Sequence, residues 1–353
     1  MNASRRQIEK SARKALERVG GDHRLPIAAA GAAAAAAAGA GVRRLISGHR
    51  NGAISDSTSY RLHSGESVSA GIKRIILARV DNALAELRGD TESTPAEAIH
   101  EARKDMKKTR SAIRLVREAL GDDLYRRENQ HYRDIGRELS GLRDAEVLVE
   151  TLDALAERFG PAQDERYAGL RDRFQQELQE RREDGSQERE MASAAAALTA
   201  GRGRVETWPL EGDGWELIAP GIHRSYRRGR KRLREVEQEV SDETLHEWRK
   251  RAKDLWYQLR LIQEAEPELI GTLAAQAHDL SDHLGDDHDL VLLREPAQRR
   301  REDFGEPGDQ RRGELQFAAS SLGERIYSEK PKKFVKRLGR RWKLWRKREP
   351  VAA

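Results

Sequence analysis

The chain has 353 residues, of which 36% are charged and 5% aromatic, and it contains no cysteine. The lack of cysteine excludes disulfides, thiolate metal sites and cysteine nucleophiles, and it fits a reducing compartment such as the cytoplasm. Lys and Arg total 66 against 60 Asp and Glu, a formal net charge of +6. Because the two signs are interleaved, function depends on whether the basic groups gather on one surface.

Residues 1–58 differ in composition from the rest of the chain. A basic stretch from Arg5 to Arg18 precedes the Ala-rich segment 27–42, and a polar linker then runs to about residue 59. The segment is short against the roughly 17–25 residues of a membrane-spanning helix, and Ala and Gly contribute little transfer energy. Two interpretations stay open: an anchor to a membrane or granule surface, and a low-complexity helix or linker.

From residue 59 onward the sequence predicts an all-α protein. Strand signals are nearly absent, and apolar residues recur with helical periodicity. Helices are expected over 67–87, from Ile99, over 132–152 and over 164–200. A loop containing Gly, Pro and Trp follows, and its first part, about 201–214, is expected to link two halves. Helices are then expected over 222–236, from Leu245, into 280–294 and near 330–348.

The helix order and the motifs occur twice. "IHEARKDMKKTR" from Ile99 returns as "LHEWRKRAKDLWY" from Leu245, 146 residues later, and "LSGLRDAEVLVETL" returns as "LGDDHDLVLLREPA". The repetition predicts two halves, about 59–200 and 215–350, within one unit spanning 59–350. Each half is expected to be a bundle of about four helices, with the two related by pseudo-twofold symmetry.

Each repeated helix carries its basic side chains on one face. At 100° per residue they fall within about 120° of arc, with apolar residues opposite. A single charged stripe is usually the solvated face of an amphipathic helix. Here a histidine opens both stripes, and acids for i,i+4 pairing are confined to their margins. The stripes are His100, Arg103, Lys104, Lys107, Arg110 and Arg114 in the first copy, and His246, Arg249, Lys250, Lys253 and Arg260 in the second.

Further basic residues follow the same pattern. His223, Arg227 and Arg230 share one face of the 222–236 helix, and Arg143 and His288 lie in the two equivalent turn motifs. If both halves direct these faces toward each other, the like charges converge and a bound polyanion would compensate them. This predicts a basic cavity between the bundles.

The C-terminal stretch 330–348 has eleven basic residues and no acid. Phe334, Leu338, Trp342 and Trp345 are spaced for one helix face, which predicts a closing helix packed on the bundle. A loose basic tail is the alternative.

The paired motifs, together with "PGIHRSYRRGRKRLR" and "LGERIYSEKPKKFVKRL", resemble the CHAD family (conserved histidine α-helical domain) from about residue 59 to 348. The resemblance implies two pseudo-twofold-related helical bundles around a basic cavity, binding of inorganic polyphosphate, and association with polyphosphate granules. The second copy departs from the first at Asp254 and Trp256, where the first has Lys108 and Arg110, so equal contact of the two halves with a ligand is in doubt. The ligand contacts it implies are His100, Arg103, Lys104, Lys107, Arg143, His223, Arg227, Arg230, His246, Arg249, Lys250, Lys253 and His288.

Such a ligand suits these residue types. Arginine grips two phosphate oxygens at once, whereas lysine acts as a flexible point charge. Binding should weaken steeply with salt, by analogy with nucleic-acid backbones. Phosphate should raise the pKa of nearby histidines, so affinity should rise as the pH falls toward 6.

Two other classes of function remain as alternatives: a metal-dependent phosphohydrolase and a nucleic-acid-binding protein. The region 278–289 is rich in His and Asp, which are possible metal ligands. "HEARK" and "HEWRK" lack the second histidine of a zinc-binding H-E-x-x-H. His278, His283 and His288 point about 140° apart on a helix, so one ion cannot collect all three. We therefore expect no catalytic residues, metal or cofactor. A nucleic-acid-binding protein would use the same basic helices, but no reading-head motif stands out, and Trp248, Trp342 and Trp345 fall on apolar stripes.

Overall fold

The computed structural model describes residues 60–299 and 305–347. Residues 1–59, including the Ala-rich segment 27–42, lie outside the described residues. Within the described part every regular element is a helix, which confirms the all-α prediction. None of these described helices is long and apolar enough to cross a membrane.

Four helices form the first bundle: α4 (Val68–Arg88), α5 (Pro95–Leu115), α7 (Asp122–Glu138) and α10 (Ser186–Glu206). The short α6 (Arg117–Leu120) joins α5 to α7. The helices α8 (Gly141–Phe159) and α9 (Pro161–Glu183) leave this bundle and pack on each other.

The second bundle consists of α11 (Ala219–Gln238), α12 (Asp242–Leu261), α13 (Pro267–Arg299) and α14 (Gly305–Ile326). The 3₁₀ turns η1 (Trp215–Leu217) and η2 (Gln263–Ala265) precede α11 and α13. The helix α13 is continuous where the first half has the separate helices α7 and α8, so the two halves differ in this element.

The first bundle extends beyond residue 200. The helix α10 includes residues 201–206, which we expected to lie in the linker because Gly201 and Gly203 are weak helix formers. At Gly201 a Cβ atom would lie 2.7 Å from Nε2 of His131 on α7. Glycine here allows α10 and α7 to approach closely rather than ending the helix.

Local sequence fixes where the two repeated helices begin. Thr94 and Glu97 form a capping box at the start of α5, and Ser241 and Thr244 do so at the start of α12. Each box satisfies two backbone N–H groups of the first turn. Because both starts are fixed, the register of each basic stripe along its helix is fixed as well.

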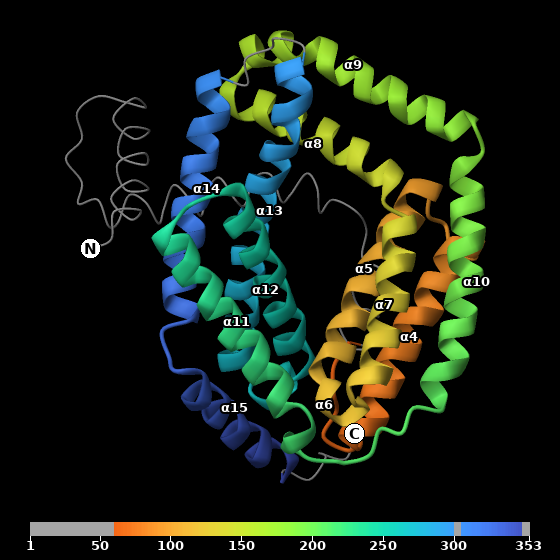
Figure 1. The fold of residues 1–353 in the computed structure, drawn as a ribbon, viewed down its shortest axis with the longest axis vertical. Helices are drawn as coiled ribbons and strands as arrows, with labels where there is room; N and C mark the ends of the chain where they lie inside the picture. The colour runs from red at the N-terminus through yellow and green to blue at the C-terminus, as the bar shows by residue number, and fades with distance from the viewer. Residues whose placement is uncertain (1–59, 300–304, 348–353) are drawn as a thin grey trace, which may run out of the picture.

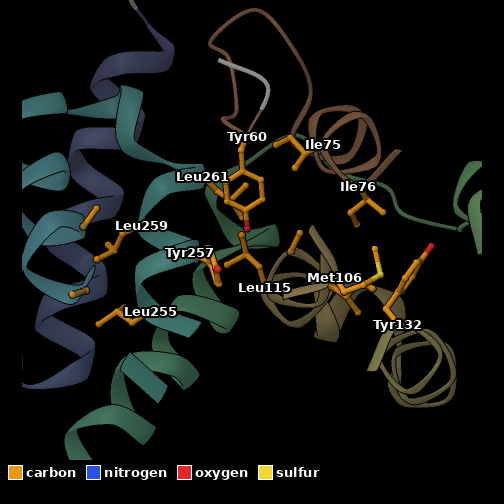
Figure 2. Close-up of a cluster of buried hydrophobic side chains, with 14 of the residues drawn as sticks. Tyr60, Ile75, Ile76, Met106, Leu115, Tyr132, Leu255, Tyr257, Leu259 and Leu261 are labelled. Carbon is orange, nitrogen blue, oxygen red and sulfur yellow. The ribbon is translucent and has the colours of Figure 1, made fainter. Parts of the chain in front are cut away.

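The bundles meet at one end through α5 and α12. Arg114 on α5 pairs with Asp254 on α12 at 2.6 Å, and Arg251 reaches the other Asp254 oxygen at 3.1 Å. Gly221 on α11 is essential to this junction, since a Cβ there would lie 2.1 Å from the Leu115 carbonyl oxygen. Figure 2 shows Tyr60, Leu115 and Tyr257 in the buried layer between the bundles.

A second hydrophobic cluster joins the bundles at the opposite end (Figure 1). The helices α8 and α9 reach across to α13 and α14 there. Because contacts exist at both ends, the helices form a closed ring in which α5 and α12 face each other. The cluster consists of Leu152, Leu155, Tyr167, Leu170, Phe174, Leu290, Leu293 and Leu315.

The C-terminal helix α15 (Pro331–Arg346) packs on α11, which confirms the predicted closing helix. Phe334, Leu338 and Trp342 are buried. The ring of Phe334 stacks on Tyr226 of α11 with centroids 3.9 Å apart. These contacts hold the most basic part of the described chain against the second bundle.

Candidate anion-binding site

The basic face of α12 meets α13 in a cluster of cationic and histidine side chains, called here the central cluster: His246, Arg249, Lys253 and His288. The imidazole rings of His246 and His288 lie 4.3 Å apart. Gly285 on α13 leaves room for the Arg249 guanidinium, because a Cβ there would come within 3.3 Å of its Nη2. The fold therefore brings the "HEWRK" and "DDHD" motifs together in space.

The central cluster is electrostatically crowded. Burial, Arg249 and His246 lower the pKa of His288 to about 4, and burial, Lys250 and Arg249 lower that of His246. Burial is also the main cause that lowers the pKa of Lys253 to about 8, with Arg249 adding to it. Burial penalises charge of either sign, whereas the effects of Arg249 and Lys250 show a positive potential in the cluster, and that potential attracts an anion.

Two members of the cluster have unused hydrogen-bonding capacity. Among residues 60–299 and 305–347, Arg249 makes no hydrogen bond or ion pair, and Nδ1 of His246 is buried without a hydrogen-bond partner. Five guanidinium N–H groups without an acceptor are costly beside a protein surface unless water or a ligand accepts them.

The first repeat contributes through α5. Lys104 lies close enough to Lys253 to lower its pKa, so the two stripes approach each other here. Lys104 pairs with Glu101 at 2.7 Å, and Lys250 pairs with Glu247 at 2.6 Å, the same i,i+3 pair in both repeats. Both glutamates lie outside the stripes, so each lysine must exchange this partner to bind a ligand.

The remaining stripe residues of α5 lie along the same helix. Arg103 donates hydrogen bonds to the carbonyl oxygens of Leu139 and Ser140, both at 3.1 Å, at the corner between α7 and α8. His100 is partly buried and Lys107 is exposed. Arg143 lies on α8, and its side chain is outside the described part of the structure.

Acidic residues on α13 accompany the basic cluster, and the sequence had indicated them only as possible metal ligands. Asp282 and Asp289 act on Lys253, opposing the fall in its pKa. Desolvation by the surrounding protein raises the pKa of Asp286 to about 6, although 52% of its side chain is exposed. Their i, i+4 and i+7 spacing was the available signal, because it places all three on one helix face.

These acids do not form a metal site with the histidines. In the described ranges no group of three His, Asp or Glu side chains is arranged to hold a metal ion. The acids instead oppose part of the positive charge of the central cluster.

Three predicted site residues belong to the junction of the bundles. Arg114 pairs with Asp254, and both Arg110 and Arg114 donate to Asn129, at 3.4 and 3.2 Å. Burial and Arg114 lower the pKa of Arg110 to about 10. Arg260 lies over the rings of Tyr60 and Trp256, 5.3 and 5.8 Å from their centroids. These contacts give the three arginines structural partners within the protein.

The three residues predicted on α11 gather elsewhere. His223 and Arg227 line a groove between α11 and α15, and Arg230 donates to the Tyr327 carbonyl oxygen at 3.0 Å. Burial, Arg227 and Lys332 of α15 lower the pKa of His223. The structure thus places some of the predicted residues in the central cluster, some at the junction, two in this groove and the others along α5, α8, α11 and α12 outside these three places.

Comparison with known proteins identifies the family. The model of the CHAD domain family matches residues 74–298, and the chain therefore belongs to the CHAD family, as the motifs predicted. The crystal structure of the CHAD domain from the plant Ricinus communis is similar with a TM-score of 0.47 and 19% identity, over 79% of this chain and 93% of that chain. No curated protein matches.

Proposed function

We propose that this CHAD-family protein binds inorganic polyphosphate without transforming it. The observation that carries the proposal is the central cluster, in which the Arg249 guanidinium has no acceptor among the described residues and lies with His246, Lys253 and His288. A chain of phosphates offers closely spaced anionic oxygens and no bases to read. Recognition by charge and hydrogen-bond geometry alone is what such a cluster supplies.

Membership of the family supports this choice of polyanion, since the family motifs imply polyphosphate. Within the proposal, Arg249 and Lys253 of α12 hold consecutive phosphates, and Lys104 of α5 contacts the same chain from the other side. His246 and His288 donate once protonated. We further propose that the protein acts in the cytoplasm at polyphosphate granules.

The test is binding of fluorescently labelled long-chain polyphosphate to the full chain, measured across salt concentrations beside single-stranded DNA. Arg249→Ala should weaken polyphosphate binding roughly 10- to 100-fold, because a hydrogen bond to a charged group contributes about 1.5–3 kcal/mol. The slope of log affinity against log salt should fall by about 0.7 for each phosphate that the variant no longer neutralises. Arg173→Ala, an exposed arginine of α9, is the matched control.

Two results would contradict the proposal. Equal affinity for DNA and polyphosphate would indicate a general polyanion-binding or nucleic-acid-binding protein. Loss of phosphate from the polymer during incubation with magnesium or manganese would indicate a phosphohydrolase.

A further inference from the structure

The groove between α11 and α15, called here the outer groove, has a volume of about 650 Å³. Small-molecule sites in proteins typically measure about 300–1,000 Å³. Ala219 and Pro220 of α11 and Val335 of α15 supply apolar wall, and Arg227, Lys332 and Lys336 supply positive charge. The groove combines an uncharged surface with a cationic one.

The cations of the outer groove are exposed and outnumber its two acids, Glu118 and Glu216. Within the described part of the chain, the side chains of Arg227, Lys332 and Lys336 make no ion pair or hydrogen bond. The neighbouring Arg224 is already paired with Glu118. The pKa of His223 is lowered by burial and by Arg227 and Lys332, which is a sign of positive potential in the groove.

The two walls are held in place by contacts behind the groove. Tyr226 of α11 stacks on Phe334 of α15, and its hydroxyl donates to the carbonyl oxygens of Ile326 and Glu329. Arg337 pairs with Glu329 at 2.7 Å. A groove with fixed walls binds without a large ordering cost.

The chemistry of the outer groove differs from that of the central cluster. An inorganic phosphate chain has no surface that would gain from contact with Ala219, Pro220 and Val335. Glu118 and Glu216 also line the groove and would repel a ligand with negative charge along its whole length. The groove therefore suits a ligand that has both a phosphate group and an uncharged part.

We infer that the outer groove is a separate binding site for a small ligand that carries a phosphate group at one end and an uncharged, largely apolar part at the other. The phosphate lies against Arg227, Lys332 and Lys336, and the uncharged part lies against the apolar wall. This site does not depend on polyphosphate binding at the central cluster.

The test uses isothermal titration calorimetry of the full chain with two probes, ATP and tripolyphosphate, without added divalent cations. ATP carries an uncharged base and sugar beside its phosphates, whereas tripolyphosphate has phosphate alone. Arg227→Ala should weaken ATP binding at least tenfold and leave tripolyphosphate binding unchanged. Arg249→Ala should weaken tripolyphosphate binding, and any ATP binding at the central cluster, while the ATP site that depends on Arg227 remains. Lys343→Ala, exposed on the same helix α15, should change neither probe.

The outcomes separate this inference from the proposed function. Three results would each overturn the proposed site in the outer groove: no ATP binding at millimolar concentration, ATP binding that depends on Arg249 and not on Arg227, and equal weakening of both probes by Arg227→Ala. Loss of tripolyphosphate binding alone, with the ATP site intact, would count only against the central cluster. Val335→Asn gives a second check, because it should weaken ATP binding while leaving every cation in place.

Discussion

Replacing Lys253 by Met should stabilise the free protein while weakening its ligand binding. The protein lowers the pKa of Lys253 from 10.5 to about 8. At 1.36 kcal/mol for each pH unit, this corresponds to a cost of ~3 kcal/mol for carrying the charge in the folded state. Contact of the recessed side chain with solvent screens part of that cost. We expect Lys253→Met to raise the free energy of unfolding by about 1–2 kcal/mol at neutral pH.

The stabilisation expected for Lys253→Met depends on pH, because the cost arises only when Lys253 is charged. Below about pH 8 Lys253 is protonated in both the folded and the unfolded state, so the full cost is present. Between that value and 10.5 the folded state loses the proton first, and the cost fades. The stability difference between the wild type and Lys253→Met should therefore be largest below about pH 8 and should vanish above the unfolded-state pKa.

Urea denaturation followed by circular dichroism at neutral and strongly alkaline pH measures this difference. Lys343→Met, an exposed lysine of α15, serves as the control and should leave stability unchanged. The affinity for labelled polyphosphate should fall about tenfold in Lys253→Met, because the variant removes one charge-assisted hydrogen bond to phosphate. Destabilisation at neutral pH, or a gain that persists at alkaline pH, would refute the electrostatic reasoning.

Three further predictions concern other charged groups. The pKa values of His246 and His288 are lowered in the free protein, that of His288 to about 4, and bound phosphate should raise them. Affinity should therefore increase as the pH falls from about 8 through 6 toward these free-state values, with proton uptake detectable by calorimetry in two buffers; a constant affinity would contradict this. Asp286→Asn should tighten polyphosphate binding a few-fold in the same fluorescence assay, since it removes a repelling carboxylate, and weaker binding would count against that role. Asp254→Ala should lower the free energy of unfolding in urea by about 3–5 kcal/mol, because Arg114 loses its partner at the buried junction; a loss below 1 kcal/mol would mean that the pair is dispensable.

The sequence predicted the helices and much of the central cluster because both depend on local periodicity. A helical wheel places His246, Arg249 and Lys253 on one face whatever the tertiary structure. The repeat then indicated that His288 belongs with them. The docking of α15 was predicted from the spacing of Phe334, Leu338 and Trp342, because this spacing places the apolar side chains on one face of the helix.

The same wheel could not separate site residues from junction residues. Arg114 has nearly the angular position of Arg103 but lies about three turns further along α5. A helical wheel gives the direction of a side chain around the helix axis. Whether that side chain contacts the other bundle depends on the point along the axis where α5 and α12 approach each other. Arg103 lies at the corner of α7 and α8, while Arg114 lies where the two repeated helices touch. The surroundings of His223 likewise depend on α15. The periodicity of α11 gives no information about where α15 packs.

The departures between the two repeats occur where the repeated helices touch. Lys108 and Asp254 hold equivalent positions and are both buried, Lys108 beside an aspartate of its own helix. With a lysine in place of Asp254, Arg114 would face a like charge in the junction. The equivalent Arg260 does face the side of Lys108, and the ring of Tyr60 lies between them, 5.3 Å from Arg260 and 6.0 Å from Lys108. Lys108 and Arg260 share the ring of Tyr60 and need no ligand to offset their charge. Arg114 needs none either, because it is paired with Asp254. The positions that keep the same basic residue and lack such internal partners are the ones left for an anion, and Arg249 is the clearest of them.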